Sequence, residues 1–370
     1  MRIGIACFPT YGGSGIIATE LAHLLAEKHE LHLVSYDKPV RLEEKTDFSF
    51  HKVELLSYPL FERVPCCYSL ALISKLSEVI KSCSLDIVHA HYAVPNATSA
   101  YLAKKICNDS VKVVTTLHGT DSYLVGSHPS YKEVTQFSMQ NSDALTAVSE
   151  YLKERTVAEF DITREIKMIP NFVDPQKFKR LKTDRKEKIV CHSSNFRPIK
   201  RIPDIIKAFK EILQEVECKL FLIGDGPERP KAQEMVRNLG ISENIKFFGN
   251  VKNVQEIIGK CDLFLLPSED ESFGLAALEA MSCEVPVIAT NVGGLKELIS
   301  HGVDGYLTEV GDVEMLAQYS LKILTDSDLQ KKLGNNAMRK VLEKYTPDKI
   351  VPKYEDLYKE TLKEKLATAA

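Results

Sequence analysis

DLFLLPSEDESFGLAALEAM, residues 262–281, is a short apolar run followed by a polar loop and a second apolar run. The first run has the length and composition of a buried β-strand, and the second, rich in alanine and leucine, is typical of a short helix. Two carboxylates complicate this pattern, because Glu271 lies just before the helix and Glu279 lies within it. A carboxylate among apolar residues is costly unless it is paired or hydrogen-bonded. The segment therefore indicates a strand–loop–helix unit that carries polar chemistry.

The same alternation of strand and helix patterns runs along the rest of the chain. It is interrupted by residues 175–188, which are basic, polar and poor in apolar residues. Alternation of this kind predicts a mostly parallel sheet covered by helices on both faces. We therefore predict an α/β protein with two doubly wound, Rossmann-like domains facing a central cleft, where ligands bind beyond the carboxyl ends of the strands. The predicted domains are residues 1–168 and 169–345, and a final charged helix, residues 346–370, is expected to cross back towards the first domain.

The composition limits the classes of function. A length of 370 residues suits two domains. The formal net charge of −3 gives no general attraction to nucleic acid. No apolar run approaches the roughly 20 residues needed to insert into a bilayer, and MRIGIACFPT reads as a strand rather than a signal peptide. The nine cysteines form no paired C-x-x-C framework, so we expect a reducing, cytoplasmic location. A homo-oligomer is compatible with this composition.

The first glycine loop has three interpretations. GSGIIA, residues 13–18, fits the dinucleotide pattern G-x-G-x-x-A, and Asp37 follows the next predicted strand about 20 residues later. Taken alone, this predicts an oxidoreductase that uses a nicotinamide cofactor. A helix N-terminus also binds other anions, because its free amides and dipole favour any phosphate or carboxylate. The third interpretation is a tight turn that binds nothing.

Several polar side chains follow predicted strands of the first domain. His118 ends VKVVTTLH and precedes Gly119, while Tyr92 ends DIVHAHY. His89 and His91 lie on one face of that strand, and no third metal ligand at a plausible spacing is evident, so a structural role is favoured for the pair. His118 is the better functional candidate, because it lies where strands of such a sheet end in the cleft.

The second domain has a basic loop and a helix start that both suit a phosphorylated ligand. Arg197 and Lys200 lie three residues apart in SNFRPIKR, and two cations there suit a diphosphate. Glu271 at the mouth of the next helix could bind sugar hydroxyls, and Glu279 could accept from a vicinal ribose diol. A nucleotide sugar has this layout. The competing interpretations are a solvated basic loop, an acidic loop around Glu271 and a solvent-facing position for Glu279.

Together these features resemble the retaining glycosyltransferases of the GT-B fold, over essentially the whole chain. The signature of that family is a pair of glutamates separated by seven residues, matched by Glu271 and Glu279 in ESFGLAALE. The glycine-rich loop, the strand-end histidine, the basic pair and the turn GDGPE at residues 224–228 occur in the family's order. In many members an arginine lies five residues before the lysine; here that position is Asn195. The resemblance leaves Arg197 as the residue that replaces this charge.

The resemblance implies a catalytic set and a donor-binding set. His118, Lys200, Arg197 and Glu271 would be catalytic, with His118 bound to the transferred sugar and the two cations to the diphosphate. Glu279 would bind the ribose. The remaining implied donor contacts are Phe273, Gly274, Leu275, Gly13, Ser149 and Asn171.

A more specific resemblance is to the subfamily that makes N-acetylglucosaminyl-malate in bacillithiol synthesis. The segments GGSG, HAHYAVP, TTLHGTD, AVS, SNFR-x-x-KR and ESFGL carry it. It implies that the chain moves N-acetylglucosamine from UDP-N-acetylglucosamine to the hydroxyl of L-malate and keeps the α configuration. The candidates for acceptor contacts are Ser14, Tyr92, Thr116 and Asn195. No D-x-D loop suggests a metal, so we expect metal-independent catalysis without a cofactor.

Three alternatives remain open from the sequence. One is the nicotinamide-dependent oxidoreductase, which leaves Glu271 and Glu279 unexplained. The second is a protein that binds a nucleotide sugar without turnover. The third is a related transferase with another acceptor, such as an inositol phosphate or a lipid-linked sugar.

Overall fold

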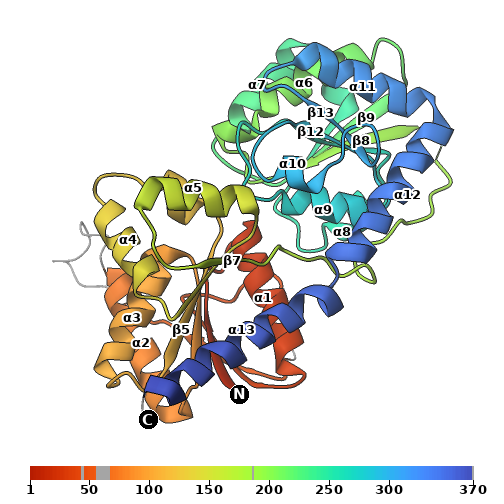
Figure 1. The fold of residues 1–370 in the computed structure, drawn as a ribbon. Helices are drawn as coiled ribbons and strands as arrows, with labels where there is room; N and C mark the ends of the chain where they lie inside the picture. The colour runs from red at the N-terminus through yellow and green to blue at the C-terminus, as the bar shows by residue number, and fades with distance from the viewer. Residues whose placement is uncertain (43–45, 56–66, 186, 369–370) are drawn as a thin grey trace. The chain divides into compact units, whose positions relative to one another are not determined.

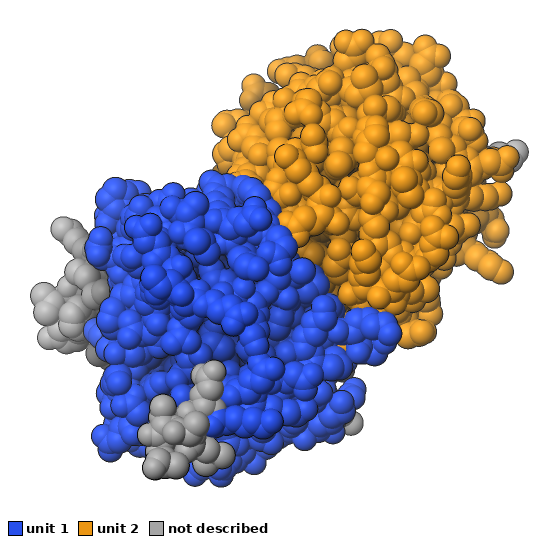
Figure 2. All heavy atoms as spheres, in the orientation of Figure 1, with its two compact units in different colours: residues 1–170, 348–370 blue, residues 171–347 orange. Residues whose placement is uncertain are grey.

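The computed structural model describes residues 1–42, 46–55, 67–185 and 187–368. The chain divides into two compact units, which Figure 2 distinguishes by colour: unit 1 is residues 1–170 with 348–370, and unit 2 is residues 171–347. The predicted domain boundaries, after residues 168 and 345, each fall two residues before these divisions. The last segment of the chain is grouped with unit 1.

Unit 1 is built on a seven-stranded sheet in the order β3-β2-β1-β4-β5-β6-β7, and every neighbouring pair is parallel. Its strands are β1 (Arg2–Ala6), β2 (Glu30–Ser35), β3 (Ser49–Lys52), β4 (Ile87–His91), β5 (Lys112–Leu117), β6 (Ala144–Ala147) and β7 (Ile166–Met168). Its helices are α1 (Gly13–Ala26), α2 (Cys67–Cys83), α3 (Thr98–Ile106), α4 (Lys132–Gln140), α5 (Glu150–Phe160) and α13 (Pro347–Thr368).

The two faces of strand β4 show how this sheet is covered. Val88 and Ala90 join a core with Leu72 and Leu76 of α2. Because side chains alternate along a strand, His89 and His91 point to the opposite face. Figure 1 shows α2 and α3 on one side of the sheet and α1 and α13 on the other. Both faces are therefore buried, as the near-continuous apolar strands of unit 1 predict.

Unit 2 repeats the architecture with a six-stranded parallel sheet in the order β10-β9-β8-β11-β12-β13. Its strands are β8 (Lys188–Ser193), β9 (Cys218–Ile223), β10 (Ile245–Gly249), β11 (Leu263–Leu266), β12 (Val287–Thr290) and β13 (Gly305–Thr308). Its helices are α6 (Ile202–Ile212), α7 (Arg229–Asn238), α8 (Gln255–Ile258), α9 (Leu275–Ser282), α10 (Leu295–Leu298), α11 (Val313–Thr325) and α12 (Ser327–Lys344).

The core of unit 2 follows from the amphipathic pattern of α6. Ile205, Ile206 and Phe209 of this helix are fully buried and pack in one cluster with Leu220 and Leu222 of β9. The α/β prediction with two doubly wound domains is confirmed. The edge strand β13 was not expected, because four residues after the turn 302–304 carry little periodic signal. No helix in the described part of the chain has the length and apolar character required to cross a membrane.

Candidate active site

In unit 1, two of the predicted acceptor-binding residues contact each other. Ser14 lies in the first turn of α1, and its hydroxyl donates to the Tyr92 hydroxyl at 2.7 Å. Tyr92 follows β4 with a φ of 90°, a left-handed conformation that is strained for a tyrosine. Gly15 is required beside them, because a Cβ there would lie 2.4 Å from the Phe8 carbonyl oxygen. This close packing holds the start of α1, where Gly13 also lies, against the end of β1.

His118 follows β5 and is 8% exposed. Its Nε2 lies 2.9 Å from Nδ1 of His91, and its ring packs edge-on against Tyr92 with centroids 5.5 Å apart. Burial lowers the pKa of His118 to about 3, so the imidazole is neutral at physiological pH. A neutral histidine can exchange hydrogen bonds with a sugar hydroxyl, but it cannot act as a cationic acid.

Asp121 is a site residue that the sequence analysis did not single out. Its Oδ1 accepts from the amides of His118 and Gly119 at 3.0 and 2.9 Å, and its Oδ2 accepts from Ala93 N at 2.8 Å. This carboxylate ties the loop after β5 to the loop after β4, so it positions both His118 and Tyr92. The burial of Asp121 raises its pKa to about 6, against the lowering effect of those amides. The motif TTLHGTD contained the signal, since an acidic residue four positions after a strand end can accept from the amides of its own turn.

Thr116 lies in a buried network rather than at a surface. Its hydroxyl is 2.7 Å from Nε2 of His89 and 2.7 Å from the Thr146 hydroxyl. His89 Nδ1 is in turn 2.8 Å from the Tyr358 hydroxyl. These partners favour a structural role for Thr116, and an acceptor contact from it stays untested. The expectation that His89 is structural agrees with this network, whereas His91 contacts His118.

Ser149 and Asn171 are also buried. The Ser149 hydroxyl accepts from Leu152 N at 3.1 Å and caps the N-terminus of α5. Asn171 follows β7 and is 5% exposed, and its side-chain oxygen has no hydrogen-bond partner within the described residues. A buried amide oxygen without a partner is unusual and suits a position that a ligand completes. Donor contacts by either residue remain predictions.

In unit 2, the structure joins two of the predicted catalytic residues. Lys200 ends the short helix η4 (Pro198–Lys200), and its ammonium forms an ion pair with the Glu271 carboxylate. The Ser268 hydroxyl donates to the same carboxylate at 2.9 Å. The side chains of Lys200 and Glu271 are only 17% and 13% exposed, so solvent screens this pair weakly. Glu271 is therefore a fixed acceptor beside a fixed cation and not merely a member of an acidic loop.

Arg197, the other predicted cation, differs from Lys200 in its exposure and its contacts. The Arg197 side chain is exposed and has no ion pair or hydrogen bond within the described residues. Arg201, which the sequence analysis did not select, contacts Glu269 at 2.7 Å and Asp204 at 2.5 Å. Its hydrogen bond to Asp204 raises the pKa of Arg201. Arg201 thus stiffens the basic loop, while Arg197 keeps its guanidinium available to an anion.

Asn195 occupies a tight corner of the same loop. A Cβ on Gly226 would lie 2.1 Å from the Asn195 carbonyl oxygen, and Gly226 has a φ of 158°. The GDGPE turn therefore packs directly on the backbone of the basic loop. The side-chain oxygen of Asn195 is buried and has no partner among the described residues. An acceptor contact from Asn195 stays a prediction.

The amides predicted to form an anion site lie at the start of α9. Gly274 precedes the helix with a φ of 93°, so Leu275 and the next two residues supply the first-turn amides that lack intrahelical partners. Phe273 is buried and packs against Tyr345 at 5.9 Å between ring centroids. The helix begins later than predicted: the amides of Phe273 and Gly274 belong to the loop, and that of Leu275 belongs to the first turn.

Glu279 lies in the second turn of α9 and is 4% exposed. The interpretation as a solvent-facing helix position is therefore wrong. Its neighbours Ala277, Leu278 and Ala280 are fully buried. The charge of Glu279 also contributes, after burial, to the raised pKa of Cys283. A carboxylate at this depth suits a ligand that brings its own hydrogen-bond donors.

Comparisons with known proteins cover both halves of the chain. Residues 11–177 match the family model described as Glycosyltransferase Family 4, and residues 173–340 match the one described as Glycosyl transferases group 1. The N-acetyl-alpha-D-glucosaminyl L-malate synthase of Bacillus anthracis is 43% identical over 375 residues, covering 98% of each chain.

Solved structures share the fold. A glycosyltransferase from Rickettsia africae ESF-5 matches with a TM-score of 0.80 at 24% identity, over 98% of both chains. A sucrose-phosphate synthase from Thermosynechococcus elongatus matches with a TM-score of 0.80 at 20% identity, over 100% of both chains. At these identities the likeness concerns the fold.

The fold and the two family matches define a glycosyltransferase of the GT-B class, as predicted. Within that class, the chain belongs to the family of the Bacillus anthracis synthase. The nicotinamide-dependent oxidoreductase finds no support, because both halves of the chain match glycosyltransferases. As a glycosyltransferase the enzyme uses a sugar donor and an acceptor.

Proposed function

We propose that this enzyme transfers N-acetylglucosamine from UDP-N-acetylglucosamine to the hydroxyl of L-malate and keeps the α configuration. The observation that carries the proposal is the 43% identity, over nearly the full length of both chains, to a relative named for that product. The arrangement of polar residues within each unit supports it.

Unit 2 supplies the proposed donor site. The buried Glu279 accepts hydrogen bonds from the ribose hydroxyls, and Glu271 accepts from hydroxyls of the sugar. Lys200, Arg197 and the first-turn amides of α9 bind the diphosphate. In the structure Lys200 is paired with Glu271, so both groups are already placed when the donor arrives. Preorganised donors of this kind stabilise charge that grows on a leaving group.

Unit 1 supplies the proposed acceptor site. The first-turn amides of α1 favour a carboxylate, and Ser14 and Tyr92 already form a hydroxyl pair beside them. His118, held neutral by burial, contacts the transferred sugar. This combination suits a small dicarboxylate such as L-malate.

In the proposed reaction, the malate hydroxyl oxygen bonds to the anomeric carbon as the bond from that carbon to the phosphate oxygen breaks. The hydroxyl proton passes to an oxygen of the departing β-phosphate, and UDP leaves. Lys200 and Arg197 stabilise the negative charge of UDP. This step requires no metal or cofactor.

UDP release from UDP-N-acetylglucosamine tests the proposal, measured with L-malate, with succinate and with no acceptor, each in the presence and absence of EDTA. Succinate is the matched control because it keeps both carboxylates and lacks the hydroxyl. We expect release with L-malate alone, unchanged by EDTA. If UDP binds but L-malate does not stimulate its release, the assignment of L-malate as acceptor is wrong. If UDP does not bind, the proposed donor site is wrong.

A further inference from the structure

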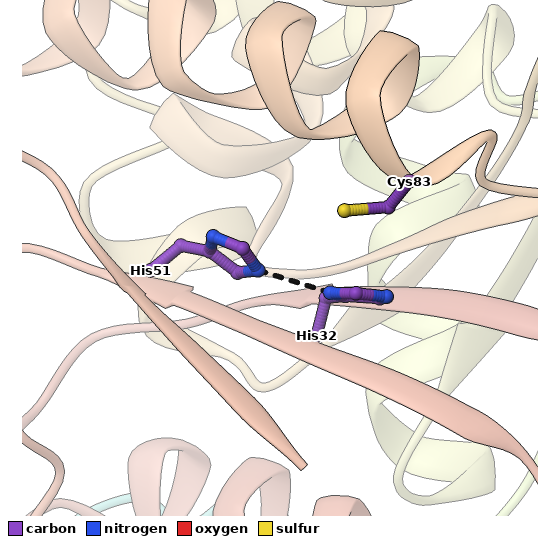
Figure 3. A group of neighbouring side chains, drawn as sticks. All are labelled: His32, His51 and Cys83. Atoms are coloured by element: carbon purple, nitrogen blue, oxygen red, sulfur yellow. Dashed lines mark hydrogen bonds between the residues drawn. The ribbon is translucent and has the colours of Figure 1, made fainter.

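Unit 1 contains a second cluster of ligand-type side chains. His32 lies on β2, His51 on β3, and Cys83 is the last residue of α2. The ligand atoms of the three side chains all lie within 4.8 Å of one another. Figure 3 shows the two imidazoles facing each other with the Cys83 sulfur beside them. In the described part of the chain, no other group of three or more such side chains meets this geometry.

The pairing of two parallel strands explains why the histidines meet. His32 is paired with Ser49, and Val34 is paired with His51. Paired residues point to the same face, so His32 and His51 share a face and are offset by two residues. Val34 packs on that face with Leu72 and Leu76 of α2, so the end of this helix brings Cys83 over the pair.

This cluster is separate from the residues proposed for catalysis. His32 and His51 lie within strands β2 and β3, whereas Ser14, Tyr92 and His118 all follow the carboxyl ends of strands in the same sheet. Strand β3 lies at the edge of that sheet and pairs only with β2. An ion held here would act on the sheet edge and not on the substrates.

Glu30 determines which nitrogen of the His32 ring carries the hydrogen. Its Oε1 lies 3.2 Å from His32 Nε2, and a carboxylate only accepts, so Nε2 carries the hydrogen. The lone pair of a neutral His32 is then on Nδ1, which lies 3.0 Å from His51 Nε2. A carboxylate behind a histidine is the usual outer partner of a metal ligand, since it fixes the tautomer and increases the basicity of the ring.

We propose that His32 Nδ1, His51 Nε2 and Cys83 Sγ bind one zinc ion, which links β2, β3 and α2. Two imidazoles and a thiolate form a ligand set that zinc prefers. Tetrahedral zinc with ordinary bond lengths separates its nitrogens by about 3.3 Å and each nitrogen from sulfur by about 3.6 Å. The two histidine nitrogens are 3.0 Å apart, about 0.3 Å closer than that spacing, and the sulfur, which lies within 4.8 Å of both, needs a shift of about 1.2 Å at most.

Binding requires two changes in hydrogen positions. The Cys83 thiol releases its proton to solvent, and His51 moves its hydrogen from Nε2 to Nδ1, so one proton is released for each zinc bound. His51 and Cys83 are half-buried, so water can reach the fourth position. The C-terminal end of the α2 dipole also favours a cation at Cys83.

Cobalt titration of the full-length chain, stripped with EDTA and then dialysed, tests the site. We expect one equivalent of Co²⁺ to produce a thiolate charge-transfer band that Zn²⁺ abolishes. Cys83→Ser should lose the band, and His51→Gln should weaken cobalt binding at least tenfold. His128→Gln, at an exposed histidine of the same unit, should change neither. Zinc should raise the unfolding temperature of the wild type and not of Cys83→Ser.

Glu30→Ala is a second test variant, chosen because it is expected to fold normally, so weaker metal binding in it cannot be due to misfolding. This side chain is 59% exposed, so its removal should leave metal-free stability unchanged while it weakens cobalt binding about tenfold. A wild-type chain that gives no thiolate band overturns the proposal. So does a band that persists in Cys83→Ser, because another cysteine would then be the ligand.

Discussion

Glu271 and Glu279 lie eight positions apart in the sequence but have different surroundings. Glu271 is held by Lys200 and the Ser268 hydroxyl beside a loop. Glu279 is inside α9, among fully buried alanines and leucines. Ionised carboxylates only accept hydrogen bonds, so both are suited to hydroxyl groups of a ligand. Their difference in depth matches the proposed division between sugar and ribose.

Lys200→Met tests the proposed leaving-group stabilisation. Loss of one preorganised donor from a developing negative charge lowers kcat by about 10²–10³-fold in other enzymes, and we expect a loss of that order here. The control is Lys207→Met, at an exposed lysine on α6. Steady-state UDP release with saturating L-malate provides the measurement. Equal kcat values for the two variants would show that Lys200 does not act on the departing phosphate.

Glu279→Gln tests the proposed ribose contact. Hydrogen bonds to a charged group contribute about 1.5–3 kcal/mol, so we expect UDP to bind roughly 10–100-fold more weakly. The control is Glu243→Gln, an exposed glutamate of unit 2. Calorimetric titration with UDP measures the change without requiring turnover. Unchanged UDP affinity would contradict the assignment of Glu279 to the nucleotide.

Among the elements, α13 is the one that joins a unit far from its own place in the chain: as expected for residues 346–370, it is grouped with unit 1. Its Tyr354 and Tyr358 are buried at 1% and 0% exposure and surround His89 of β4. Glu355 of the same helix pairs with His29 at 3.1 Å. The helix therefore fills the face of the sheet opposite α2 and supports the strand that leads to Tyr92.

Tyr358→Phe tests this support. The substitution keeps the ring and removes the hydroxyl, which leaves Nδ1 of the buried His89 without a partner. An unsatisfied buried polar group costs about 1–3 kcal/mol, and we expect unit 1 to be destabilised by that amount. Tyr131→Phe, at a half-exposed tyrosine, is the matched control. Urea unfolding followed by circular dichroism measures both, and equal midpoints would show that the hydrogen bond contributes nothing.

For the whole molecule, buried histidines predict instability in mild acid. Burial lowers the pKa of His89 and of His118 to about 3, and that of His192 to about 4. The unfolded chain therefore binds more protons than the folded chain between these values and about 6.5. Stability is lost as the pH falls through this range. Each such histidine contributes about 1.4 kcal/mol per pH unit at most.

The carboxyl group of Asp121 has the opposite effect on the pH dependence of stability. Because burial raises the pKa of Asp121 to about 6, its contribution to stability falls as the pH rises from about 4 to 6. It offsets one histidine of the three, so these four groups together give an expected net loss of about 2.7 kcal/mol per pH unit at most. Burial lowers the pKa of His91 as well, which adds a loss in the same direction. Urea unfolding at pH 7.5, 6.5 and 5.5 measures it. A free energy of unfolding that stays constant from pH 7 to 5.5 would contradict the buried, neutral state of these rings.

Sequence patterns determined the elements and their order. Apolar runs bounded by glycine or polar residues gave the strands of both units except β13, since strands buried on both faces need continuous apolar side chains. The loop–helix segment 267–281 and the basic loop 194–201 pointed to the site for the same local reason: cations, carboxylates and free helix amides a few residues apart are visible without a fold. The start of α9 was misjudged because the left-handed Gly274 delays it.

Only the tertiary structure decided which distant side chains meet. His89 and Tyr358 lie 269 positions apart, and Lys200 and Glu271 lie 71 apart. His32, His51 and Cys83 show no recognisable metal-binding spacing, because strand register and the end of a helix bring them together. Asp121 likewise positions the loop after β4 only because the fold brings the Ala93 amide to its carboxylate. The spacing of apolar residues along the chain predicts which helix or strand each residue belongs to. These contacts depend instead on how the helices and strands pack against one another.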